Sequence, residues 1–100
     1  MHSTRRFVLA DQQRFDTVSA YGTNDICRTP HIDALAENGM KFTNAFTPSA
    51  ICAPARASLM TGLYPHKHGV VDNYTDIRDG IPLLGDRMKE AGYYCGYAGK

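Results

Sequence analysis

The feature that most restricts the fold is an alternation of apolar, strand-like segments with helix-like segments along 100 residues. Strand-like patterns favour strands at residues 6–9 and 93–98, and the alternation of Phe42, Asn44 and Phe46 with smaller residues favours a strand or extended segment at residues 41–47. Helices are expected at residues 30–38, 54–61 and 82–91, because each of these segments opens on a proline and ends before a glycine. A long loop is expected at residues 64–80. Strands interleaved with helices predict an α/β fold with a mostly parallel sheet flanked by helices.

The predicted sheet has too few strands for a complete α/β domain. A mostly parallel sheet is covered by helices on both faces. Three short strands and their helices do not make such a covered sheet. We therefore expect the chain to be an incomplete part of a larger α/β domain.

Composition excludes several classes of protein. The chain has 11 Lys and Arg against 10 Asp and Glu, a net charge of +1, and 43% hydrophobic residues. This charge is too small for a nucleic-acid binder, and the hydrophobic fraction is too high for a disordered tail. No stretch approaches the roughly 20 apolar residues of a membrane span. We therefore expect neither a nucleic-acid partner nor a membrane partner.

The first residues and the cysteines bear on the cellular compartment. The basic start is followed by a short apolar run at residues 7–10 and then by Asp11, whereas a secretory signal has roughly 7–15 apolar residues. Cys27, Cys52 and Cys95 are widely spaced and form no CxxC pair, which is typical of free thiols rather than of a disulfide framework. The predicted location is the cytoplasm.

The densest chemical signal lies in residues 49–62, which read SAICAPARASLMTG. Cys52 stands at the start of the helix expected around Pro54. A helix N-terminus offers unpaired N–H groups and a positive dipole end to a thiolate or an oxyanion. Arg56 follows about one turn later, and its guanidinium suits sulfate or phosphate. This arrangement favours a nucleophile in an anion-binding site; the alternative is a structural cysteine beside a solvated arginine.

The pattern Cys52-x-Pro54-x-Arg56, followed by Leu-Met-Thr-Gly, resembles the signature of type I sulfatases. Other segments that resemble this family lie at residues 7–14, 29–39, 64–69 and 92–100. The resemblance implies an alkaline-phosphatase-like fold, of which residues 1–100 would be the N-terminal portion. It also implies that a formylglycine-generating maturation enzyme oxidises Cys52. The hydrated formylglycine would then attack the sulfur of a small-molecule sulfate ester.

The same resemblance implies a metal and two cationic side chains at the site. Asp11 and Cys52 would bind a divalent metal, with Ca²⁺ expected and Mn²⁺ or Mg²⁺ as alternatives, and a carboxylate suits such hard cations. Many relatives carry a second aspartate where this chain has Gln12. Arg56 and Lys100 would stabilise the charge on the sulfate oxygens.

Two further residues are candidates for substrate binding. A single acid at Asp11 is similar to the choline-sulfatase and phosphonate-monoester-hydrolase branch, in which an asparagine at the place of Asn73 contacts the sulfuryl or phosphoryl group. His68, in the expected loop, is a candidate for substrate contact or for packing. Sulfatase activity is the expected function. The alternatives are a phosphonate monoester or phosphodiester hydrolase and a non-catalytic truncated fragment.

Overall fold

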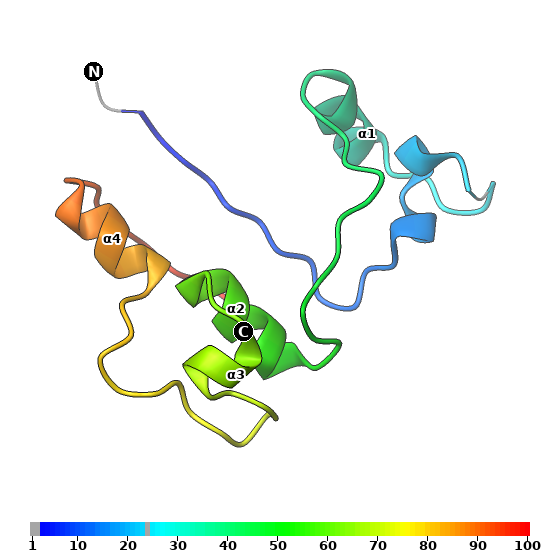
Figure 1. Cartoon of the computed structure of the whole chain (residues 1–100). Helices are drawn as coiled ribbons and strands as arrows, with labels where there is room; N and C mark the ends of the chain where they lie inside the picture. The colour runs from blue at the N-terminus through cyan, green and yellow to red at the C-terminus, as the bar shows by residue number, and fades with distance from the viewer. Residues whose placement is uncertain (1–2, 24) are drawn as a thin grey trace. The chain divides into compact units, whose positions relative to one another are not determined.

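The computed structural model describes residues 3–23 and 25–100. They divide into two compact units, one reaching to Ala45 and one running from residue 46 to residue 100 (Figure 1). Each unit has its own buried side chains: Val18 in the first, and Pro54, Ala57, His68 and Val70 in the second. Among the described residues, no helix has the length and apolar character needed to cross a membrane.

The first unit contains the 3₁₀ turns η1 (Phe15–Thr17) and η2 (Ser19–Tyr21) and the helix α1 (Pro30–Glu37). Helix α1 confirms the helix expected at residues 30–38. Its first turn carries Pro30, where the missing N–H costs no hydrogen bond. At its other end, the Asn38 side-chain amide donates to the Ala34 carbonyl oxygen at 2.8 Å. The local signals in the sequence therefore set both ends of this helix.

The Asp33 carboxylate, in the first turn of α1, ties this helix to η2. It accepts hydrogen bonds from the Ser19 hydroxyl at 2.5 Å and from the Ala20 N–H at 2.8 Å. It also accepts the Thr29 hydroxyl at 2.9 Å. The bond from Ser19 is the main reason why the pKa of Asp33 lies below its usual value, since it favours the charged carboxylate.

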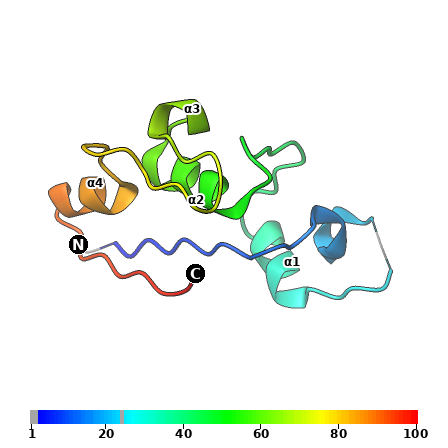
Figure 2. The same cartoon turned by 90° about the horizontal axis from the view of Figure 1, so that it is seen from below.

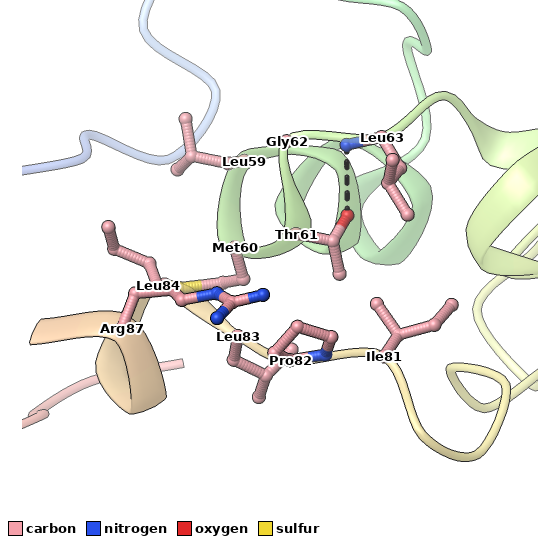
Figure 3. Close-up of a pocket in the computed structure, with 10 residues that line it drawn as sticks. All are labelled: Leu59, Met60, Thr61, Gly62, Leu63, Ile81, Pro82, Leu83, Leu84 and Arg87. Atoms are coloured by element: carbon pink, nitrogen blue, oxygen red, sulfur yellow. Dashed lines mark hydrogen bonds between the residues drawn. The ribbon is translucent and has the colours of Figure 1, made fainter. Parts of the chain in front are cut away.

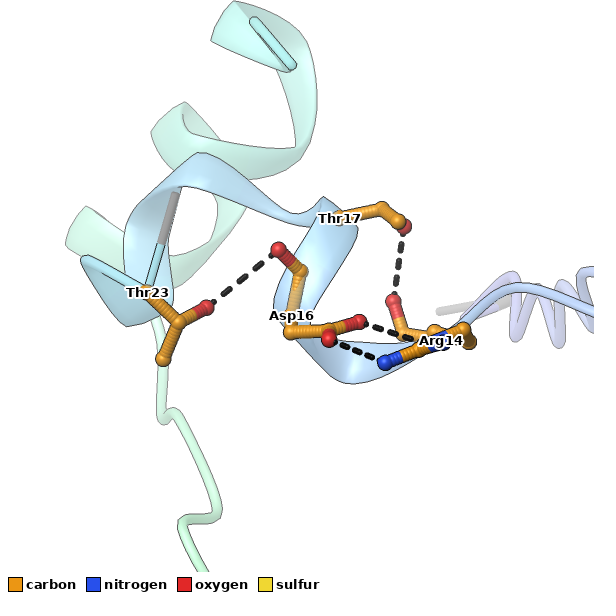
Figure 4. A network of polar contacts seen from close by, with 4 residues as sticks. All are labelled: Arg14, Asp16, Thr17 and Thr23. Atoms are coloured by element: carbon orange, nitrogen blue, oxygen red, sulfur yellow. Dashed lines mark hydrogen bonds and ion pairs between the residues drawn. The ribbon is translucent and has the colours of Figure 1, made fainter. Parts of the chain in front are cut away.

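A second polar network surrounds η1 (Figure 4). The Arg14 guanidinium donates to both carboxylate oxygens of Asp16, at 2.9 and 2.5 Å. The Thr17 hydroxyl donates to the Arg14 carbonyl oxygen at 2.7 Å, and the Thr23 hydroxyl donates to the Asp16 carbonyl oxygen at 3.3 Å. The hydrogen-bonded ion pair with Arg14 lowers the pKa of Asp16. These contacts join residues close in sequence, so they stabilise the local turn.

The second unit is built around α2 (Cys52–Thr61), with α3 (Pro65–His68) and α4 (Leu84–Glu90) packed against it. Gly62 ends α2 with a φ of 72°, a left-handed conformation that favours glycine. Helix α3 lies beside α2 in both Figure 1 and Figure 2. The buried side chains of this unit lie on α2, on α3 and directly after α3, so α2 is the centre of its packing.

The helices of the second unit differ from expectation at their starts. The helix expected from Pro54 begins at Cys52 instead. The helix expected from Pro82 begins at Leu84, because the Asp86 side chain accepts the Leu83 N–H at 2.8 Å and makes Leu83 the N-cap. The side-chain cap, rather than the proline, therefore sets where α4 begins.

The long loop expected at residues 64–80 is wrong in part, because residues 65–68 of it form the helix α3. Pro65 opens this short helix after an extended Tyr64. Gly69 closes it with a φ of 88°. Proline at the first position and a left-handed glycine after the last one are ordinary helix signals. Because Pro65 and Gly69 are only four residues apart, the sequence favoured a loop over a helix.

The predicted strands at residues 6–9, 41–47 and 93–98 are absent, and no described residue lies in a β-strand. The mostly parallel sheet is therefore not confirmed. A strand exists only through hydrogen bonds to a neighbouring strand, and none of these segments pairs with another here. Phe7 and Val8, for example, stay 61% and 81% exposed. The sequence pattern identified apolar segments correctly but could not supply their pairing partners.

Candidate active site

Helix α2 begins without a polar cap of its own. Its N-cap residue, Ile51, has an extended backbone and an apolar side chain that accepts no hydrogen bond. Cys52 is the first helical residue and is half-buried. Pro54 has no N–H, and the Ala55 N–H donates to the Ile51 carbonyl oxygen at 3.0 Å. The Ile51 N–H donates to the Ser49 hydroxyl at 3.1 Å, so the N–H groups of Cys52 and Ala53 are the remaining donors without a partner within the helix or its N-terminal flank.

Asn73 supplies the missing cap from another segment of the chain. Its side-chain Oδ1 accepts the Ala53 N–H at 3.0 Å. The residue that the resemblance assigned to substrate contact therefore lies at the start of α2, next to the backbone of Cys52. The Asn73 side chain is exposed, and its amide nitrogen is a donor of the kind that binds an oxyanion.

Arg56 lies on α2 about one turn after Cys52 and is half-buried. Residues four apart on an α-helix lie on the same face, so Cys52 and Arg56 share a face of α2. The first two turns of α2 therefore combine a thiol, a permanent positive charge and the positive end of the helix dipole. This combination suits a tetrahedral oxyanion.

His68 is placed inside the protein rather than in an exposed loop. Its side chain is fully buried, and its Nε2 lies 2.9 Å from the Ser58 hydroxyl. Its Nδ1 accepts the Val70 N–H at 3.1 Å, so a neutral ring with its proton on Nε2 satisfies both partners. Packing, the alternative role of His68, agrees with this geometry. Substrate contact by His68 stays a prediction, which the burial disfavours.

Ser58 and Arg78 belong to the same region, and sequence reasoning missed both. The Arg78 N–H donates to the His68 carbonyl oxygen at 2.9 Å. Its guanidinium donates to the carbonyl oxygens of His66 and Lys67, both at 3.2 Å. Arg78 therefore caps the C-terminal end of α3, where a cation is favoured. No sequence signal pairs an arginine with a short helix that ends about ten residues earlier.

Asp11 and Lys100 are the remaining predicted site residues. Asp11 belongs to the first unit and is exposed. The next residue, Gln12, has a φ of 56°, the one positive φ among the described non-glycine residues. Lys100 is exposed, and its carbonyl oxygen accepts the Tyr97 hydroxyl. The metal and sulfate roles of these two residues stay predictions.

The described residues do not assemble a metal centre by themselves. They contain no group of three or more His, Cys, Asp or Glu side chains that could hold an ion. The Asp11 carboxylate has the right chemistry for a hard divalent cation, but such ions take about six to eight oxygen ligands as Ca²⁺. Asp11 therefore fits as one ligand of a metal site, not as the site.

A pocket of about 420 Å³ lies at the opposite end of α2, between its last turn and α4 (Figure 3). Its lining is mostly apolar and consists of residues 59–63, residues 81–84 and Arg87. The Leu63 N–H donates to the Thr61 hydroxyl at 3.2 Å on its wall. None of the predicted site residues lines this pocket, so the candidate site is the N-terminal end of α2.

Comparison of the amino-acid sequence with known proteins shows to which family the chain belongs. The family model described as sulfatase matches residues 6–100. The chain belongs to the sulfatase family. It is 48% identical to an ulvan-active sulfatase from Formosa agariphila, over 94% of this chain and 19% of the relative. It is 39% identical to a choline-sulfatase from Rhizobium meliloti, over 79% of this chain and 15% of the relative.

A human relative, N-sulphoglucosamine sulphohydrolase, is 39% identical over 93% of this chain and 19% of its own length. This sulfatase-family chain thus spans about a fifth of the length of the curated relatives that it matches. No solved structure matches it. Membership of the family implies an alkaline-phosphatase-like fold, and sulfatases generally use a formylglycine and a divalent metal.

Proposed function

We propose that residues 1–100 are the N-terminal portion of the catalytic domain of a sulfatase that hydrolyses a small-molecule sulfate ester. The observation that carries this proposal is the position of Cys52 as the first residue of α2, within the sequence Cys-x-Pro-x-Arg. The family match and the sulfatase names of the relatives support it.

In this proposal a formylglycine-generating enzyme oxidises Cys52, and the hydrated aldehyde supplies the nucleophile. Arg56 and Lys100 stabilise negative charge on the sulfate oxygens. Asn73 donates through its amide nitrogen while its Oδ1 holds the Ala53 N–H. The position of Cys52, Arg56 and Asn73 at the N-terminal end of α2 supports the proposal, since that end favours a bound anion.

The proposal includes a divalent metal, with Ca²⁺ preferred, to which Asp11 and the modified Cys52 would contribute ligands. Bound there, the ion supplies positive charge next to the sulfate oxygens. The proposal also includes the mostly parallel sheet, in which residues 6–9, 41–47 and 93–98 would pair with strands from the rest of the domain. The exposed apolar side chains of Phe7 and Val8 are consistent with burial of such a sheet under helices from the rest of the domain.

The test uses the complete protein, expressed together with a formylglycine-generating enzyme. We expect hydrolysis of an aryl sulfate, and we expect Cys52→Ala to abolish turnover because it removes the nucleophile. Mass spectrometry of the wild-type peptide should find an aldehyde side chain at Cys52. The matched control is Cys95→Ala, which removes another half-buried thiol and should keep turnover. An active enzyme with an unmodified thiol at Cys52 would refute the mechanism.

A phosphonate monoester or phosphodiester hydrolase is the second candidate. The observation that favours it is Asn73 at the start of α2, since an asparagine there resembles the branch that contains both activities. A sulfate monoester and a phosphodiester are both tetrahedral and singly charged. Comparing kcat/KM for an aryl sulfate and an aryl phosphonate monoester decides between them.

A further inference from the structure

We propose that His68 is a positioning residue, which holds the Asn73 side chain at the start of α2 by fixing the loop of residues 69–77. The inference rests on the proposed function in one respect, namely that Asn73 contacts the bound anion. Three sets of contacts carry it: the buried contacts of His68, the closure of the loop by Arg78, and the turn that presents Asn73.

The first set links His68 to the middle of α2. The Nε2–H of His68 donates to the Ser58 hydroxyl at 2.9 Å, in a site where the imidazole is fully buried. The Nδ1 of the same ring accepts the Val70 N–H, at the start of the loop. Because a buried donor or acceptor without a partner is costly, this ring holds α2 and the loop in one relative position.

The second set closes the loop at its base. The Arg78 N–H donates to the His68 carbonyl oxygen at 2.9 Å, so the two ends of the loop meet at one peptide. The Arg78 side chain lies over Gly69, whose missing side chain leaves it room. His68 therefore contacts the loop at both ends, through its ring on one side and its carbonyl oxygen on the other.

The third set presents Asn73 to α2. The Asp72 carboxylate accepts the Tyr74 N–H at 2.9 Å and the Thr75 hydroxyl at 2.6 Å, which forms a tight turn around Asn73. The Asn73 Oδ1 then accepts the Ala53 N–H. The loop is thus attached to α2 near its first turn through Asn73 and near its middle through Ser58 and His68. Loss of the contact between Ser58 and His68 would therefore allow the loop, and with it the Asn73 side chain, to move away from the first turn of α2.

The test is a double-mutant cycle in the complete, matured enzyme, with His68→Leu and Asn73→Ala made singly and together. His68→Leu removes both ring nitrogens, and we expect kcat/KM to fall about tenfold, the factor that corresponds to about 1.4 kcal/mol. If His68 acts through Asn73, its replacement should cost little once Asn73 is already alanine. Equal losses in both backgrounds would overturn the proposal.

The matched control is His66→Leu, which removes an exposed histidine of α3 whose ring stacks on Tyr64 instead of bonding to α2. It should leave kcat/KM unchanged. His68→Gln should restore most of the loss, because its amide offers one donor and one acceptor to the same two partners. If His68→Leu does not fold, Ser58→Ala serves in its place, since it removes only the hydroxyl that the ring contacts.

Hydrogen exchange separates this inference from the proposed function, since it needs no turnover. The Ala53 amide should exchange faster in Ser58→Ala and His68→Leu than in His66→Leu, because its Asn73 partner is released. Faster exchange in an enzyme that turns over no sulfate ester would support the positioning role and count against the sulfatase proposal. Unchanged exchange at Ala53 would overturn the positioning role, whatever the activity.

Discussion

Gly69 offers the sharpest test of how α3 and the loop after it are held. It adopts a φ of +88°, a conformation that residues with a Cβ rarely adopt. A Cβ at this position would lie 2.8 Å from the Arg78 Cγ and 3.0 Å from its Nε. Gly69→Ala therefore combines an unfavourable backbone conformation with a steric clash near the root of the Arg78 side chain.

The cost of each effect can be estimated separately. A left-handed alanine costs about 1–2 kcal/mol. Displacing Arg78 also weakens its bonds to the carbonyl oxygens of His66 and Lys67, which adds roughly 0.5–1.5 kcal/mol, at the lower end because the guanidinium is exposed. We therefore expect Gly69→Ala to lower the free energy of unfolding by roughly 1.5–3 kcal/mol.

Gly80→Ala is the matched control, since Gly80 has a φ of +78° and a Cβ added to it would meet no atom within 4 Å. Gly80→Ala should lower the free energy of unfolding only by the cost of a left-handed alanine. Urea titrations of the complete protein would measure both variants by linear extrapolation. The same replacement of Gly69 in an Arg78→Ala background should cost about as much as Gly80→Ala. Equal losses for Gly69→Ala and Gly80→Ala in the native background would refute the argument from Arg78.

Two other predictions concern pH and metal. Because the pKa of Asp33 is lowered in the folded chain, its stabilising contribution is present above the usual carboxyl pKa and is lost as the pH falls through the lowered value. The urea concentration at the midpoint of unfolding should therefore fall less between about pH 5 and pH 2 in Asp33→Asn than in the wild type. An equal fall in both proteins would contradict this. Calorimetric titration of the 100-residue chain with Ca²⁺ should give no micromolar binding, since the described residues gather no set of three ligands; micromolar binding would place a complete site within this chain.

The helices were predictable where neighbouring residues determine them. Thr29 and Pro30 start α1, and Gly62 ends α2, as their positions in the sequence indicate. These signals work because a helix bonds residues four apart, so its ends depend on local chemistry. Neighbouring strands of a parallel sheet are separated by a crossover of a dozen or more residues, and the segments at 6–9 and 93–98 have no strand partner among the described residues. This is why the pattern was sufficient for helices and insufficient for a sheet.

The candidate site shows the same difference between contacts within one helix, which the sequence predicts, and contacts between segments, which it does not. Cys52 and Arg56 were predictable together because their spacing places them on one face of a single helix. Asn73 was predicted from the resemblance alone, and the structure adds a reason for its place, namely the Ala53 N–H that it accepts. The bond between Ser58 and His68 joins two helices. Nothing in the spacing of those two residues indicated that contact, so it emerged only from the folded chain.

The start of α2 connects these observations. A helix that carried its own polar cap would fill its N-terminal end with a neighbouring side chain. Here Ile51 leaves that position apolar, and Pro54 removes one of the donors. The cap comes instead from Asn73, whose position depends on a loop attached elsewhere to the same helix. The geometry around Cys52 is therefore set by a buried contact two turns away, and the chemistry proposed for this helix end depends on packing that the signature residues do not contain.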